Sequence, residues 1–118
     1  MITAQFTAAG GSIMLQLQGH AGSAPKGKDL ICAAASMLAY TLAQTMEFMQ
    51  EEGGLQVKPT IRLEDGDVLI LAKPKPDRYA EALHAFFVTQ AGYHLLQHNY
   101  PRNVKLCSFG GCKSRVDS

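Results

Sequence analysis

A histidine and a cysteine near the start of the chain are the residues best suited to chemistry. His20 ends a run of alternating apolar residues, and Cys32 lies three residues after Asp29, which opens a helical pattern. This spacing predicts an imidazole at the end of a strand and a thiol in the first turn of a helix. The partial positive charge of a helix N-terminus favours a thiolate, and a nearby imidazole can take the thiol proton. The chemistry indicated is nucleophilic attack by a cysteine on a carbonyl carbon.

Asp29 is the expected N-cap of this helix. Its carboxylate would accept a hydrogen bond from the backbone N–H of Cys32. Exposed N–H groups at the same helix end can polarise a substrate carbonyl, which would form an oxyanion hole from main chain alone. A carboxylate one turn from a thiol also opposes its ionisation, and the sequence leaves the sign of the net effect open.

The spacing alone favours a purely structural role for His20 and Cys32 over a catalytic one. A cysteine in an alanine-rich helix is usually a small buried hydrophobe, and a histidine at the end of a strand is usually a surface residue. The glycine-bearing segment between His20 and Cys32 and the Asp29 cap add only modestly to the catalytic interpretation.

The elements that must position these residues follow from the apolar pattern. Alternation predicts strands, spacings of three and four predict helices, and clustered glycine and proline predict loops. Pro59 confines its strand to an edge or a bulge, and Asp77 is the expected cap of the second helix. The expected elements are strands 2–8 and 13–17, a loop over 19–28, a helix over 29–52, strands 55–63 and 68–72, a helix over 77–99 and a short strand 104–108.

The order ββαββαβ predicts an α+β fold, a two-layer sandwich in which two helices cover one face of a mixed β-sheet. The run Val68-Leu69-Ile70-Leu71 is apolar on both sides, so the other face also needs cover. A homodimer could provide it.

Composition excludes several classes of protein. The 118 residues fit one domain with its own core, and a net charge of +1 gives no electrostatic case for binding nucleic acid. The chain has no apolar run long enough to cross a membrane, and its first residues do not resemble a signal peptide. We therefore expect a cytoplasmic protein with reduced cysteines and no membrane partner.

Cys107 and Cys112 stand near the C-terminus. A zinc site would need two more ligands, of which His98 is the only nearby candidate, so no metal is expected. The pair could form a disulfide on oxidation, and two reduced thiols in a loose tail is the preferred expectation. We predict a domain over 1–106 and a tail over 107–118.

Two segments resemble the ribosomal-processing cysteine protease family, Prp. They are Gly19-His20-Ala21-Gly22 and Gly27-Lys28-Asp29-Leu30-Ile31-Cys32-Ala33-Ala34-Ala35-Ser36. The resemblance is specific in residues and in spacing, and with the order of elements it extends to about Leu106.

The resemblance implies a bacterial cysteine endopeptidase with a Cys–His dyad and no cofactor, acting as a homodimer. The implied substrate is the precursor of large-subunit ribosomal protein number twenty-seven, whose N-terminal extension is removed after a Phe-Phe pair. By position, Cys32 is the nucleophile and His20 the general base, and Asp29 and Ser36 have supporting roles. Gly19, Gly22 and Gly27 would let the loop close over substrate.

Two other functions stay open. The first is a non-catalytic ribosome-associated or dimerisation module that keeps the fold and has lost activity. The second is a thiol redox protein, which is weaker because the chain has no C-x-x-C and Cys32 has no resolving partner nearby in sequence.

Overall fold

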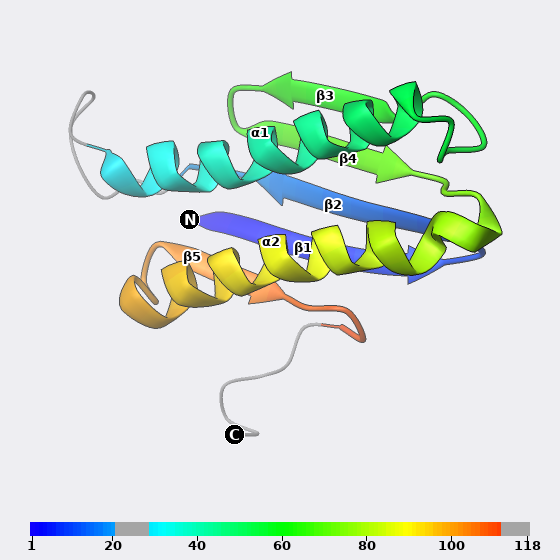
Figure 1. Cartoon of the computed structure of the whole chain (residues 1–118). Helices are drawn as coiled ribbons and strands as arrows, with labels where there is room; N and C mark the ends of the chain where they lie inside the picture. Colours follow the sequence, from blue (N-terminus) through cyan, green and yellow to red (C-terminus); the bar gives the residue numbers. More distant parts are fainter. Residues whose placement is uncertain (21–28, 112–118) are drawn as a thin grey trace.

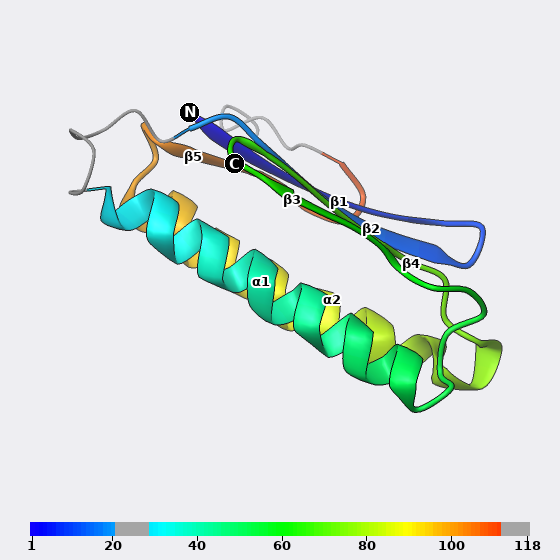
Figure 2. The ribbon, with the colours of Figure 1, turned by 90° about the horizontal axis from the view of Figure 1, so that it is seen from above.

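The computed structural model describes residues 1–20 and 29–111, which form a five-stranded sheet with two long helices on one face (Figures 1 and 2). The observed order confirms the predicted ββαββαβ arrangement and the α+β class. The elements are β1 (Ile2–Ala9), β2 (Ser12–Gln18), α1 (Leu30–Glu51), β3 (Thr60–Glu64), β4 (Asp67–Ala72), the short 3₁₀ helix η1 (Pro76–Arg78), α2 (Tyr79–Asn99) and β5 (Val104–Cys107).

The sheet has the strand order β3-β4-β2-β1-β5. β5 pairs with β1 in parallel and the other neighbours are antiparallel, so the sheet is mixed as predicted. β4 lies directly beside β2, which brings the β3–β4 turn to the end of β2 that leads into His20 (Figure 1). This neighbourhood positions the candidate site.

The core lies between the sheet and the two helices (Figure 2). Alternate strand residues point to opposite faces, and those facing the helices, such as Phe6, Leu15 and Ile70, are buried. Tyr93 of α2 is fully buried and donates a hydrogen bond from its hydroxyl to the backbone oxygen of Ala35 in α1, over 2.7 Å. α2 is therefore tied to the same part of α1 that carries Cys32.

The opposite face of the sheet carries a small apolar patch. Met14 pairs with Leu71, and Leu69 lies in the adjacent row opposite Gln16. All three apolar residues are partly exposed, in agreement with the expectation that β4 is apolar on both sides. A homodimer covering this patch stays a prediction.

Two predicted boundaries are wrong. The strand expected over 55–63 is regular only from Thr60, because Pro59 cannot donate to a ladder and Leu55 makes only an isolated bridge with Pro74. The second helix begins at Tyr79, and Asp77 lies in η1, where Pro76 opens a tighter turn.

The residues after Leu106 pack on the domain as far as the structure describes them. Cys107 pairs with Gln5, and the ring of Phe109 lies 5.5 Å from that of Phe6 and 5.3 Å from that of Phe87, between centroids. Cys107 is buried and takes part in a disulfide, so the preferred expectation of a reduced thiol is wrong at this residue. The rest of the predicted tail, 112–118, lies outside the described residues.

Within residues 1–20 and 29–111, no group of three His, Cys, Asp or Glu side chains is arranged to hold a metal ion. In the same part of the chain, no helix is both long and apolar enough to cross a membrane.

Candidate active site

His20 follows β2 at the end of the sheet where α1 begins (Figure 1). The preceding residue, Gly19, donates its backbone N–H to the carbonyl oxygen of Gly66 over 3.0 Å. A Cβ atom at Gly19 would collide with the carbonyl oxygen of Met1. Position 19 thus needs glycine for a close approach of two backbones, and this approach fixes the point from which the His20 side chain leaves the sheet.

Cys32 lies in the first turn of α1, and its predicted cap is confirmed. Oδ1 of Asp29 accepts the backbone N–H of Cys32 over 2.9 Å, and the backbone oxygen of Asp29 accepts the N–H of Ala33. The first turn of the helix is therefore held closed by Asp29.

The thiol of Cys32 also donates a hydrogen bond to the Asp29 carboxylate. This bond and the backbone N–H of Cys32 are the main reasons why the pKa of Asp29 lies below its ordinary value, and the charge of His20 contributes in the same direction. Asp29 is consequently a carboxylate at neutral pH, in contact with the thiol.

The expected oxyanion hole from exposed N–H groups of this helix end stays a prediction, and the N–H groups of Cys32 and Ala33 are not among its available donors. Both N–H groups are already bonded to Asp29. What the helix end still supplies is its partial positive charge next to the sulfur.

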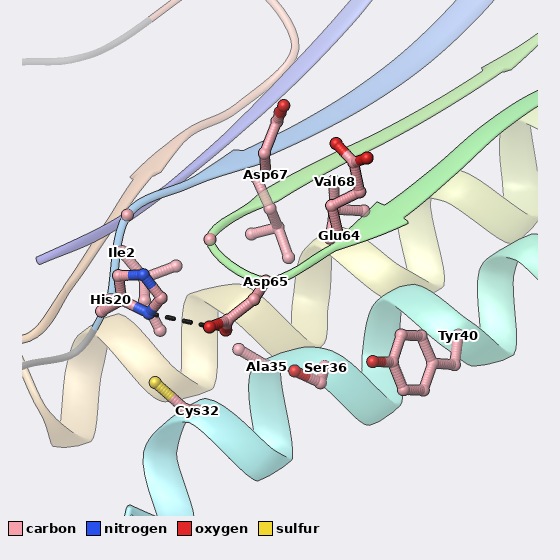
Figure 3. A pocket seen from close by; sticks show the side chains of 13 residues that line it. Ile2, His20, Cys32, Ala35, Ser36, Tyr40, Glu64, Asp65, Asp67 and Val68 are labelled. Carbon is pink, nitrogen blue, oxygen red and sulfur yellow. Dashed lines mark ion pairs between the residues drawn. The ribbon is translucent and has the colours of Figure 1, made fainter.

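His20 and Cys32 open onto one pocket of about 180 Å³ (Figure 3). The sulfur points from α1 towards the side of the pocket on which the imidazole lies. Ser36 and Tyr40 follow Cys32 at intervals of four residues and line the same pocket from α1. The remaining lining residues are Ile2, Leu17, Gly19, Ala35, Glu64, Asp65, Gly66, Asp67 and Val68.

The β3–β4 turn brings carboxylates to this pocket. Oδ1 of Asp65 lies 3.8 Å from Nδ1 of His20, whereas Asp67 and Glu64 lie 3.1 and 3.9 Å from the guanidinium of Arg62. Asp65 is therefore the carboxylate of this turn that pairs with the imidazole.

The structure thus brings together four predicted site residues, His20, Asp29, Cys32 and Ser36. Gly19 lies at the edge of the same pocket, and the predicted loop glycines Gly22 and Gly27 lie outside the described residues.

Sequence reasoning missed Tyr40, Asp65 and Gly66 as site residues. Tyr40 could have been found from its spacing of eight residues after Cys32 on one helix. The Asp65-Gly66 pair indicates a turn, and nothing in the pair itself shows that β4 pairs with β2.

A thiol at a helix N-terminus and an imidazole across a small pocket are the two groups that a thiol-dependent hydrolase requires. Their arrangement on this α+β fold is compatible with the cysteine protease class.

The family model described as cysteine protease Prp matches residues 1–105, and the chain belongs to this family. Its members are hydrolases.

Solved structures share the fold. The ribosomal processing protease Prp from S. aureus, in complex with a covalently linked product peptide, is 21% identical with a TM-score of 0.72, over 92% of this chain and 99% of that one. SMU.848 from Streptococcus mutans is 26% identical with a TM-score of 0.67, over 92% of this chain and 94% of that one. Among curated proteins no relative matches the chain.

Proposed function

We propose that this chain is a ribosomal processing endopeptidase. It removes the N-terminal extension of large-subunit ribosomal protein number twenty-seven after a Phe-Phe pair, with Cys32 as nucleophile and His20 as general base. The observation that carries the proposal is the opening of both side chains onto one pocket, with the thiol in the first turn of α1. Membership of the Prp family supports it.

A similar protein gives independent support for a peptide substrate. The S. aureus Prp was crystallised both with a substrate peptide and with a covalently linked product peptide. The structure with the substrate peptide is 19% identical to this chain, with a TM-score of 0.65, over 92% of this chain and 99% of that one.

The pocket suits one or two side chains of an extended peptide. Its volume of about 180 Å³ lies below the roughly 300–1,000 Å³ of small-molecule sites. Its apolar lining comes from Ile2, Leu17 and Val68, with the ring of Tyr40 at one side. An apolar or aromatic side chain such as phenylalanine matches this lining.

The proposed reaction has two stages. The proton of Cys32 passes to His20, the sulfur attacks the scissile carbonyl carbon, and the protonated imidazole gives its proton to the leaving amine. Water then attacks the thioester with His20 again as base, which returns the thiol and releases the carboxylate product. The cap that Asp29 forms on the backbone N–H of Cys32 keeps the sulfur next to the helix end in both stages.

The test is cleavage of the purified ribosomal-protein precursor, followed by intact-mass measurement of both products. Wild type is expected to release the extension ending in Phe-Phe, and Cys32→Ala and His20→Ala to leave the precursor intact. Asp77→Asn, an exposed change in η1, is the matched control and should cleave like wild type. An uncleaved precursor with wild type, or equal cleavage by Cys32→Ala, would overturn the proposal.

The same experiment separates the non-catalytic alternative. A ribosome-associated or dimerisation module would bind the precursor and leave it uncut with wild type and variants alike.

We also propose a cytoplasmic homodimer whose interface includes Met14, Leu69 and Leu71. Sedimentation of wild type and Leu71→Glu tests it, and a monomer in both cases would contradict it.

A further inference from the structure

The pocket shared by His20 and Cys32 extends along α1. The imidazole and the thiol lie at one end of it, and Tyr40 lies at the other (Figure 3). Tyr40 follows Cys32 by eight residues, which places it about 12 Å further along the helix axis. Residues 64–68, from the β3–β4 turn and the start of β4, form the opposite wall. A peptide in this pocket thus meets the thiol at one end and an aromatic ring at the other.

We propose that Tyr40 is a specificity-determining residue: its ring packs against the side chain of the fourth substrate residue before the scissile bond and favours an apolar side chain there. The proposal rests on the proposed function. That function places the Phe-Phe pair before the cut, in the apolar lining next to Cys32, so the residues that precede the cut run from Cys32 towards Tyr40.

The spacing of an extended peptide selects the fourth residue. An extended chain advances about 3.3 Å per residue, so the Cα atom of this residue lies roughly 10 Å from the scissile carbonyl. Side chains on a helix slant towards its N-terminus, and the hydroxyl of Tyr40 is directed towards Ser36 (Figure 3). The ring therefore covers a stretch of the pocket slightly less than 12 Å from Cys32, where the fourth residue lies.

The surroundings of the ring favour an apolar side chain. Tyr40 is 47% exposed, so a substrate side chain can reach its ring, and Ala35 and Val68 line the same pocket. An aliphatic group packed on an aromatic ring removes apolar surface from water on both partners. An acidic side chain would instead meet the carboxylates that Glu64 and Asp67 contribute to the opposite wall, and like charges repel.

Phe48 provides the matched reference for Tyr40. It lies on the same helix, eight residues further along, and its side chain is 54% exposed. Phe48 does not line the pocket. Phe48→Ala and Tyr40→Ala therefore remove similar exposed rings from α1, and only Tyr40→Ala removes one from the pocket.

The kinetic test uses two synthetic peptides that contain Phe-Phe before the cut and differ only in the fourth residue before it, leucine or glycine. Wild type is expected to cleave the leucine peptide with a kcat/KM about tenfold higher. Tyr40→Phe and Phe48→Ala should keep this ratio, and Tyr40→Ala should bring it to within about twofold of one. A ratio near one in wild type, a wild-type ratio in Tyr40→Ala, or a lost preference in Tyr40→Phe or Phe48→Ala would overturn the proposal.

A second readout measures binding without cleavage. Fluorescence anisotropy of the two labelled peptides gives their Kd for Cys32→Ala and for Cys32→Ala/Tyr40→Ala. We expect the leucine peptide to bind Cys32→Ala about tenfold more tightly than the glycine peptide, and the double variant to bind both equally. The same preference in both proteins, or none in Cys32→Ala, would overturn the inference.

The two proposals fail separately. If wild type leaves the precursor uncut while the affinities differ as expected, the proposed function is wrong and the role of Tyr40 stands. If wild type cuts the precursor after Phe-Phe while the affinities do not depend on Tyr40, the inference alone is wrong.

Discussion

The carboxylate of Asp29 accepts two hydrogen bonds from a single residue, Cys32: one from the backbone N–H, 2.9 Å from Oδ1, and one from the thiol. The first bond caps α1 and holds the cysteine at the helix end. The second places a negative charge beside the group that must ionise. Asp29 therefore positions the thiol at the helix end, and its charge lies beside the group that must ionise.

Asp29→Asn separates these two effects. The asparagine oxygen can still cap the helix, whereas the charge that opposes the thiolate is removed. Alkylation of Cys32 by iodoacetamide at neutral pH, followed by peptide mass spectrometry, is expected to be about three- to tenfold faster than in wild type. Asp77→Asn should label like wild type. Slower labelling in Asp29→Asn would mean that the charge of Asp29 assists the thiolate.

The stability of the fold should fall in acid, in part through Asp29. Hydrogen bonds from Cys32 hold the pKa of Asp29 below its ordinary value, and a hydrogen bond from Arg78 lowers the pKa of Glu81 in the same way. A carboxylate with a depressed folded-state pKa stabilises the fold above its unfolded-state pKa, near 4. That contribution is lost as the pH falls through the lower, folded-state value.

Urea unfolding from pH 6 to pH 2.5 measures this loss. The free energy of unfolding of wild type is expected to be nearly constant above about pH 5 and to fall below that pH. Asp29→Asn and Glu81→Gln should each make the acid decline shallower, and the double variant shallower still. A decline in Asp29→Asn as steep as that of wild type would remove Asp29 from this role.

Tyr93 links α2 to the part of α1 that carries the thiol. Its hydroxyl donates to the carbonyl oxygen of Ala35 over 2.7 Å, and burial raises the pKa of Tyr93, so it stays a neutral donor. Tyr93→Phe removes the donor and keeps the ring, and is expected to lower the free energy of unfolding by about 1–2 kcal/mol in urea. Tyr100→Phe, an exposed change, should stay within about 0.5 kcal/mol of wild type. Equal stability of Tyr93→Phe and wild type would contradict this prediction.

Much of the fold could be predicted because its signals are local. The alternation in β1 and β2 and the spacing along α1 depend on neighbouring residues, and Asp29 is followed by Cys32 at the distance that a cap requires. The predicted starts of β3 and α2 are wrong because of two prolines. Pro59 cannot donate a hydrogen bond to the sheet, so β3 begins only at Thr60, and Pro76 opens a 3₁₀ turn before α2.

The part of the site that could not be predicted depends on tertiary pairing. Asp65 and Gly66 meet His20 only because β4 lies beside β2, and the order of strands in a sheet has no local signature in the sequence.

Gly66→Ala should impair activity more than stability. The backbone at position 66 has φ +74°, and the new Cβ would come within 2.6 Å of Nε2 of His20. The methyl group must displace the imidazole or cover its nitrogen. We expect kcat on the precursor to fall by on the order of 10- to 100-fold, the scale of effect that follows from a misplaced catalytic group.

Gly53→Ala is the matched control. Its φ of +78° is nearly the same, and nothing lies within 4 Å of an added Cβ, so this variant measures the backbone strain alone. Both variants are expected to lose about 1–2 kcal/mol of unfolding free energy, because an L-residue is disfavoured at positive φ. Only Gly66→Ala should lose activity. Wild-type activity in Gly66→Ala, or an equal loss in Gly53→Ala, would show that the contact between Gly66 and His20 has no part in catalysis.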